Sequence, residues 1–430
     1  MAQNSDSKNY ALTLDIIKLY EPYLLMFPDY YKSLCNLLNT VIYKENDSSM
    51  FWQYKLFFGI MASSTLGNEF LLDDFKEIFL LLGGDKSWID EGLKCKNMPD
   101  HIKGIAIINN ILANKPWILD WRQFFEFKNG LSTFLFQSAI ILTTIQRFSN
   151  ILSTLNLIIN NDMNNIEKKI NNNENPETNP NKEEKAHNNK QREQENKITI
   201  DDKEKNDKGN NQQDKYLNKE KLEKRRTKII NLVKKNYSEF KEIDEDKSNL
   251  IINNSIFKKY ISDFIISYTN FDQHMEKYLY EEDFSWKNAQ YFYFDYAGKE
   301  MEYLDKEMKV LENLNSQNCE IKNKKLDIFT LREVIEKYLM LIYGLKDEDY
   351  NYHLTNELIP LHLKKIIKKI ASGPERIKEQ ELISCLEILN NKEFTYLIFI
   401  VTSIKQKISL IFFAKAYDEF TSNNKLMDNN

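Results

Sequence analysis

The sequence predicts an all-α protein, and three observations support this fold class. The chain has only 11 Gly and 8 Pro among 430 residues, so few positions would interrupt a helix. Apolar residues make up 42% of the chain, and they recur at the three- and four-residue spacing of a helix face. No run of alternating apolar and polar residues is long enough to predict a sheet. The length favours two or three domains.

The first clear helix covers residues 70–82, where apolar side chains recur along one face. Gly83-Gly84 follows and supplies a left-handed stop. Asp85 is then placed to cap a short helix that includes Trp88. The pattern therefore predicts two helices separated by a tight glycine turn.

Two further helices are predicted before residue 160. One begins near Asp100 and ends ahead of Pro116. The other is long and follows Gly130, with a single apolar stripe that runs from Leu135 to Ile159.

One change of composition divides the chain. Residues 160–226 are mainly Asn, Lys, Glu, Gln and Asp, with hardly an aromatic residue. Such a segment buries too little apolar surface to offset its ordering entropy, and it is interpreted as a disordered linker. A nucleic-acid-binding tail is the alternative, but its acidic residues interleave with the basic ones. The sequence thus predicts helical domains at 8–159 and 227–422 on either side of the linker.

The C-terminal segment is predicted to be helical as well. Thr330 and Glu333 have the spacing of a capping box, in which each side chain accepts a hydrogen bond from the backbone amide of the other residue at the start of the helix. Apolar residues follow at helical spacing until Gly344. Near the end of the chain, two apolar runs are separated by Lys405 and Lys407, as expected of a core helix with one solvated edge.

Composition and motifs argue against several classes of function. The net charge of -5 provides no basic field for nucleic acid or anionic lipid. No apolar stretch approaches the roughly 20 residues of a membrane span. The four Cys residues form no CxxC pair and have no His at metal-ligand spacing, which suits a reducing compartment. No phosphate-binding, dinucleotide, metalloprotease or serine-hydrolase motif is present, so no catalytic residue, metal or cofactor is predicted.

Four stretches, in order, resemble the sestrin family. LLLGGDKSWID at 80–90 and INNILANKPWIL at 108–119 are similar to two turns of the family's N-terminal domain. EDFSWKNAQYFY at 282–293 and IYGLKDEDYNY at 342–352 are similar to two segments of its C-terminal half. The resemblance implies two all-α halves, each similar to the bacterial alkylhydroperoxidase AhpD, joined by the linker.

The family's peroxidase-like activity requires a reactive Cys with His residues nearby, and this chain departs from that pattern. Asn68 occupies the Cys position, while Leu66 and Phe75 occupy the flanking His positions. Asn cannot act as a redox nucleophile. An AhpD-like peroxide reductase is the alternative function, and it would have to use Cys35 or Cys95.

The resemblance also implies an amino-acid pocket in the C-terminal half. Leu331-Arg332 matches the family's carboxylate-binding position, and Glu393 matches its ammonium-binding position with one residue of gap. The threonine-rich lid of the family pocket is replaced by NLNSQNC at 313–319. The expected ligand is leucine or another amino acid. A protein that binds it could be a TOR regulator, or alternatively an all-α amino-acid-binding module unrelated to TOR. The other interpretation is that Arg332 and Glu393 are solvated charges at helix starts.

Docking to a GATOR-type regulatory complex is the third property that the resemblance implies. The corresponding acidic-aromatic stretch comprises Glu348, Asp349, Tyr350 and Tyr352, and exposed Tyr with carboxylates suits protein docking. Without the resemblance, the same residues would be interpreted as a solvated turn after Gly344. The sequence thus predicts a stress- and amino-acid-responsive negative regulator of TOR kinase signalling, located in the cytoplasm and the nucleus.

Overall fold

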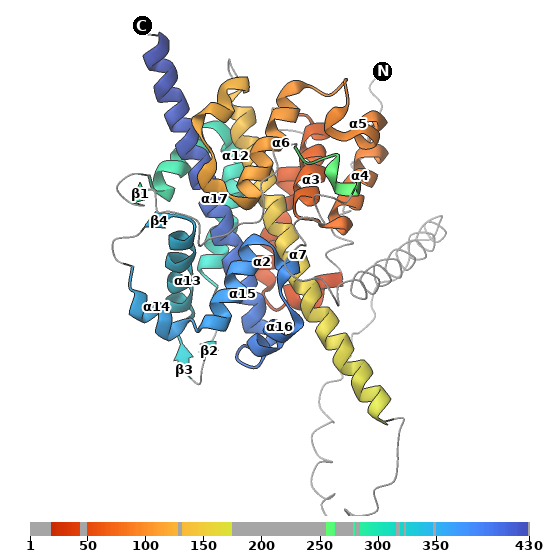
Figure 1. The fold of residues 1–430 in the computed structure, drawn as a ribbon, viewed down its shortest axis with the longest axis vertical. Helices are drawn as coiled ribbons and strands as arrows, with labels where there is room; N and C mark the ends of the chain where they lie inside the picture. Colours follow the sequence, from red (N-terminus) through yellow and green to blue (C-terminus); the bar gives the residue numbers. More distant parts are fainter. Residues whose placement is uncertain are drawn as a thin grey trace, which may run out of the picture. The chain divides into compact units, whose positions relative to one another are not determined.

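The structure is a computed structural model that describes residues 19–43, 50–127, 131–173, 255–262, 278–279, 284–314, 319–321, 324–346 and 350–428. Within these ranges the regular secondary structure consists of helices and four short strands, joined by turns and loops (Figure 1). The predicted all-α class is confirmed.

In the N-terminal part, the helices and helical turns from residue 28 onward lead to the long helix α7. In order they are α2 (Pro28–Leu38), the π-helical turn η1 (Asn39–Tyr43), α3 (Trp52–Thr65), α4 (Glu69–Leu81), α5 (Lys86–Glu91), η2 (Gly92–Lys94), α6 (Asp100–Asn114), η3 (Pro116–Ile118), η4 (Trp121–Phe127) and α7 (Ser132–Asn173).

The predicted boundaries around α4 are confirmed. Leu82 closes the helix, and Gly83 follows with a φ of 87°, a left-handed conformation that a residue without a Cβ adopts at little cost. The Asp85 carboxylate accepts a hydrogen bond from the Ser87 amide at 2.8 Å and so caps α5.

The second half contains the remaining elements. In order they are α10 (Ser255–Lys258), β1 (Tyr278–Leu279), α12 (Trp286–Glu312), β2 (Cys319–Ile321), β3 (Lys324–Leu326), α13 (Ile328–Ile342), β4 (Leu345–Lys346), α14 (Tyr352–Leu358), α15 (Leu361–Ser372), η7 (Pro374–Arg376), α16 (Glu379–Leu386) and α17 (Asn391–Asp428).

The strands form two small sheets that the sequence pattern did not predict. β1 pairs with β4 in parallel, and β2 pairs with β3 in antiparallel orientation. Each strand has only two or three residues. A segment of that length is too short to show the two-residue periodicity from which a strand is recognised.

The start of α13 differs from the predicted capping box. The helix begins at Ile328, and the cap is Asp327, whose carboxylate accepts from the Thr330 amide at 3.3 Å. Glu333 instead pairs with Lys337 at 3.5 Å on the exposed face of the helix. An Asp three residues earlier therefore replaces Thr330 as the cap, because its carboxylate already reaches the free amide.

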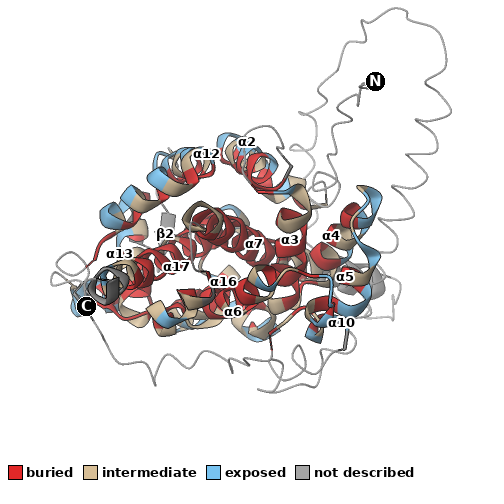
Figure 2. Cartoon of the chain, turned by 90° about the horizontal axis from the view of Figure 1, so that it is seen from above, coloured by how far each residue is buried: buried red, intermediate tan, exposed pale blue. Residues whose placement is uncertain are grey.

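The interior of the protein is built on α7 and α17. Figure 2 shows these two helices in the middle of the fold, coloured mainly as buried, with α2 and α12 along one side. α17 is apolar enough to span a membrane by composition, with a mean hydropathy of 1.7, but 94% of its most apolar window is buried within the protein. It is a core helix. The predicted solvated edge is wrong at Lys405, which is only 5% exposed.

The chain divides into two compact units. One comprises residues up to Ile158 and from Asn236 onward, and the other comprises Ile159–Lys235. In the second unit the structure describes the end of α7, which continues to Asn173. The predicted linker therefore begins as helix, and its residues 174–226 lie outside the described part. The division into domains 8–159 and 227–422 stays a prediction.

Candidate functional site

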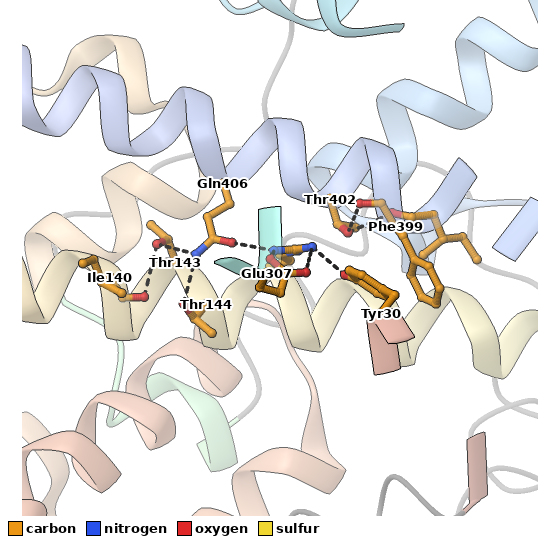
Figure 3. A network of polar contacts seen from close by, with 10 residues as sticks. Tyr30, Ile140, Thr143, Thr144, Glu307, Phe399, Thr402 and Gln406 are labelled. Carbon is orange, nitrogen blue, oxygen red and sulfur yellow. Dashed lines mark hydrogen bonds and ion pairs between the residues drawn. The ribbon is translucent and has the colours of Figure 1, made fainter. Parts of the chain in front are cut away.

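A buried ion pair lies where four helices meet. Arg147 of α7 and Glu307 of α12 form two parallel hydrogen bonds of 2.6 and 2.7 Å. Their side chains are 1% and 0% exposed. The Arg147 guanidinium also donates to the Tyr30 hydroxyl of α2 at 2.5 Å and to Gln406 Oε1 of α17 at 3.1 Å. Figure 3 shows Gln406, Glu307 and Tyr30 in one row along this network.

The network extends along α7 through Gln406. The Gln406 amide donates to the hydroxyls of Thr144 at 2.9 Å and Thr143 at 3.3 Å. The Thr143 hydroxyl in turn donates to the Ala139 carbonyl at 2.8 Å. Side chains from both halves of the sequence thus satisfy one another in the core, as buried polar groups require.

The electrostatics of this site favour the charged form of Arg147. Burial alone would lower the pKa of the guanidinium, but the adjacent Glu307 and Tyr30 outweigh it and raise that pKa above its ordinary value. Burial raises the pKa of the Tyr30 phenol, so Tyr30 stays a neutral hydrogen-bonding partner. The site is a buried polar contact in which both terminal nitrogens of Arg147 have partners, while its Nε has none.

Sequence reasoning missed this network, although one signal was present. Arg147 is the only charged residue between Gly130 and Asp162. A single charge inside a long apolar helix requires a buried partner. The partner itself, Glu307, is one of many acidic residues in the second half, and only the fold identifies it.

Asn68, at the position of the family's redox Cys, has a structural role. Its side-chain oxygen accepts from the Leu71 amide at 3.1 Å, which caps α4. Its side-chain nitrogen donates to the Ser149 carbonyl at 3.4 Å and the Ser153 hydroxyl at 3.3 Å, both on α7. Phe75 is 1% exposed and packs directly over Gly59. These residues hold α3, α4 and α7 together.

The three Cys residues whose side chains the structure describes, Cys35, Cys95 and Cys385, lack the features of an activated thiol. Burial raises the pKa of the Cys35 thiol, and it raises the pKa of the Cys385 thiol to about 12. Cys95 is buried, with its sulfur 3.2 Å from the Ser87 hydroxyl. Among the described residues, no group of three or more His, Cys, Asp or Glu side chains is arranged to hold a metal ion.

The predicted amino-acid anchors begin two helices that pack against each other, α13 and α17. Arg332 is the fifth residue of α13; it donates to the Glu312 carbonyl at 3.0 Å and lies 3.9 Å from the Glu312 carboxylate. Leu331 beside it is buried. Glu393 lies in the first turn of α17 and forms a reciprocal cap with Asn390, with bonds of 2.9 and 3.0 Å. Both charged residues thus have local structural partners.

Two residues of the predicted docking stretch are visible in the structure. The rings of Tyr350 and Tyr352 meet edge to face with their centroids 4.4 Å apart, and Tyr352 is 58% exposed. Between them, Asn351 caps α14 by accepting from the Leu354 amide at 2.9 Å. Glu348 and Asp349 lie outside the described residues. The residue between the two tyrosines is thus held by the start of α14.

Comparison with known proteins gives the chain a family context. The model of the family described as PA26 p53-induced protein (sestrin) matches residues 4–420. A sestrin homolog of Drosophila melanogaster is 27% identical over 133 residues, which is 30% of this chain and 26% of the relative. Sestrin-3 of Mus musculus is 23% identical over 162 residues, covering 37% and 33%, and a sestrin homolog of Dictyostelium discoideum is 24% identical over 164 residues, covering 37% and 27%. The aligned stretches thus span a third or less of these relatives' lengths.

Proposed function

The chain belongs to the sestrin family, and we propose that it is a non-catalytic regulator that restrains TOR kinase signalling by docking to a GATOR-type complex. Amino-acid starvation and oxidative stress are the conditions under which it acts, in the cytoplasm and the nucleus. In this proposal the two halves are AhpD-like helical domains, and residues 160–226 are the linker between them.

The observation that carries the docking proposal is the tyrosine pair at the start of α14, in which Tyr352 is exposed and Tyr350 is half-buried. Tyr352 is 58% exposed and rests against Tyr350. A tyrosine ring buries a large area on a partner while losing little conformational entropy. Glu348 and Asp349 directly precede the pair in sequence, and their carboxylates would set the orientation of a partner with basic residues.

The environment of Asn68 supports a non-catalytic function. A thiol peroxidase requires a thiolate beside a base or a positive charge. At this position the chain has an amide that caps α4 and binds α7, beside a buried Phe75. The side chains there stabilise helix packing, which is the property a scaffold requires.

The amino-acid ligand is the second part of the proposal. Arg332 would bind a carboxylate, Glu393 would bind an ammonium group, and Leu331 would contact the ligand's apolar side chain. Leucine is the first candidate, and another amino acid is the second, because the lid sequence departs from the family. Binding would require Arg332 to exchange the Glu312 carbonyl for the ligand.

Partner capture tests the docking surface. Glu348→Lys, Asp349→Lys and Tyr352→Ala, combined in one chain, should abolish capture of the regulatory complex from cell extract. Tyr291→Ala is the matched control, since Tyr291 is a tyrosine of α12 that is 69% exposed. Equal capture by the triple variant and the wild type would refute docking at this surface.

Thermal-shift titration with each free amino acid tests the ligand. We expect one amino acid to raise the melting temperature of the wild type and to lose that effect in both Arg332→Ala and Glu393→Ala. The effect must persist in Glu333→Ala, an exposed carboxylate on the same turn of α13. A response that survives both anchor substitutions would show that the pocket lies elsewhere.

A further inference from the structure

A short segment of the second half is docked on the first half. Residues 255–262 follow the described N-terminal helices by more than eighty residues of sequence. Figure 1 draws this segment in green beside α3, α4 and α5, and Figure 2 shows α10 next to α5. We call residues 255–262 the strap.

The strap is held by backbone contacts to the turn after α5. The Leu93 amide donates to the Lys259 carbonyl at 2.9 Å. Gly92 allows this approach, since a Cβ at that position would lie 2.1 Å from the same carbonyl oxygen. Gly92 also has a φ of 62°, which disfavours any side chain. The glycine therefore lets the strap backbone pack directly against this turn.

Tyr260 is the main anchor of the strap. Its side chain is 0% exposed, and its hydroxyl donates to the Ile89 carbonyl at 2.7 Å. The ring lies edge-on to Phe57, with their centroids 6.1 Å apart. The Lys76 ammonium lies 5.5 Å from the centre of the ring, a favourable cation–π distance. The Ile89 carbonyl recognises the hydroxyl group, and the contacts with Phe57 and Lys76 recognise the aromatic ring.

The charges around Tyr260 select the neutral phenol. Burial raises its pKa, and the carboxylates of Asp90 and Asp73 raise it further. The hydroxyl points at a carbonyl acceptor, so an oxygen without a proton has no donor there. A phosphate on this oxygen would lose the hydrogen bond and would have to fit where the side chain is fully buried, although the Lys76 and Lys259 ammonium groups lie 5.5 and 5.1 Å from the ring centre.

Two further side chains complete the contact. Phe257 is 6% exposed, and the Ser262 hydroxyl accepts from the Asn110 amide of α6 at 3.1 Å. Two buried aromatic rings and a few hydrogen bonds therefore order eight residues of backbone. That number of contacts leaves little net stabilisation once the ordering entropy is counted, which is the property of a segment that opens locally.

We propose that the strap is a releasable clasp, and that the surface beneath it is a docking site for a short segment with an aromatic residue, an unmodified Tyr three residues later and a Ser two residues after that. In the closed state the strap occupies its own site. When it opens, the site on α3, α5, η2 and α6 accepts another copy of the same motif. This inference is independent of docking at Tyr352.

Binding of the strap as a separate peptide tests the proposal. A fluorescent peptide of residues 253–264 is titrated against the full-length chain, and its anisotropy is measured. The variant Phe257→Ala with Tyr260→Ala frees the site, so it should bind the peptide at least about tenfold more tightly than the wild type, where the strap competes. Adding Gly92→Val should abolish binding. A peptide phosphorylated at Tyr260 should fail to bind.

Hydrogen exchange of the wild type supplies a second measurement that needs no variant to fold. The Leu93 amide should exchange at least about tenfold faster than amides in the middle of α17, and its rate should not change in dilute denaturant. If the Leu93 amide exchanges only through global unfolding, the strap is a permanent part of the fold, and the proposal is overturned. Failure of the peptide to bind a folded strap-free variant would overturn it as well.

Discussion

Two buried basic side chains on the central helices, Arg147 of α7 and Lys405 of α17, lie in opposite electrostatic environments. Arg147 has a carboxylate, Glu307, as its bidentate partner, and its pKa is raised. Lys405 of α17 has only neutral partners among the described residues: its ammonium donates to the Leu112 carbonyl and to the Ser409 hydroxyl, the latter at 3.0 Å. Burial lowers the pKa of Lys405 to about 7. At similar burial, Glu307 thus stabilises the charge of Arg147, whereas Lys405 has its charged form disfavoured because no carboxylate pairs with it among the described residues.

The position of Lys405 explains why a lysine is tolerated there. Leu112 lies in the last turn of α6, where backbone carbonyls lack helical partners. An amine donates to such a carbonyl whether or not it is protonated. The comparison shows that hydrogen-bonding geometry and charge compensation are separate requirements. Glu307 compensates the charge of Arg147, whereas Lys405 has hydrogen-bond acceptors but no carboxylate partner among the described residues.

The largest effect is expected when Arg147 loses its carboxylate. Glu307→Ala leaves a buried guanidinium without a counter-charge and should reduce the free energy of unfolding by about 3–5 kcal/mol. Urea unfolding followed by circular dichroism measures it. The control is Arg147→Met with Glu307→Leu, which removes both charges and should recover most of the loss. Equal losses in the single and double variants would show that the ion pair is not the cause.

The pH dependence of stability should identify Lys405. Its folded pKa of about 7 is below that of an ordinary lysine, so the unfolded chain binds more protons between these values. The contribution of Lys405 to the free energy of unfolding therefore rises with pH above 7, by about 1.4 kcal/mol per pH unit. Lys405→Met should flatten the rise between pH 7 and 9, where tyrosines do not yet ionise. Parallel curves for the two proteins would contradict an uncompensated lysine.

A smaller loss is expected at Tyr30. Tyr30→Phe keeps the ring that packs 4.5 Å from Phe399 and removes only the hydroxyl that Arg147 binds. A further donor of the guanidinium, besides Nε, loses its partner, so we expect the free energy of unfolding to fall by about 1–2 kcal/mol in the same urea experiment. Tyr291→Phe, at an exposed position, is the control and should leave the midpoint unchanged.

The smallest effect is expected for the partly exposed pair of Arg332 and Glu312. Their charged groups are 3.9 Å apart, and Glu312 is half exposed. Glu312→Ala should change the free energy of unfolding by about 0.5 kcal/mol or less, because water screens the interaction. A loss comparable with that of Glu307→Ala would erase the distinction between buried and exposed pairs.

Local sequence signals predicted the helical class and several boundaries. Gly83 and Asp85 act through contacts within a few residues, and the structure has both as expected. The start of α13 was predicted wrongly because two caps competed, and the sequence does not show that Asp327 reaches the Thr330 amide first.

The buried polar contacts depend on the fold and were not predictable in the same way. Arg147 and Glu307 are 160 residues apart, and nothing local connects them. Lys405 was predicted to be solvated because lysine usually is, but α17 is packed on every side at that level. The amino-acid anchors and the docking stretch came from the family resemblance and stay predictions.

The most direct test of the proposed function is TOR activity in cells whose only copy of this protein is the triple variant Glu348→Lys, Asp349→Lys, Tyr352→Ala. Phosphorylation of a TOR substrate is measured after amino-acid withdrawal, with wild type and Tyr291→Ala as references. We expect phosphorylation to fall in both references and to stay high in the triple variant. A fall of equal size in the triple variant would contradict regulation through the α14 surface.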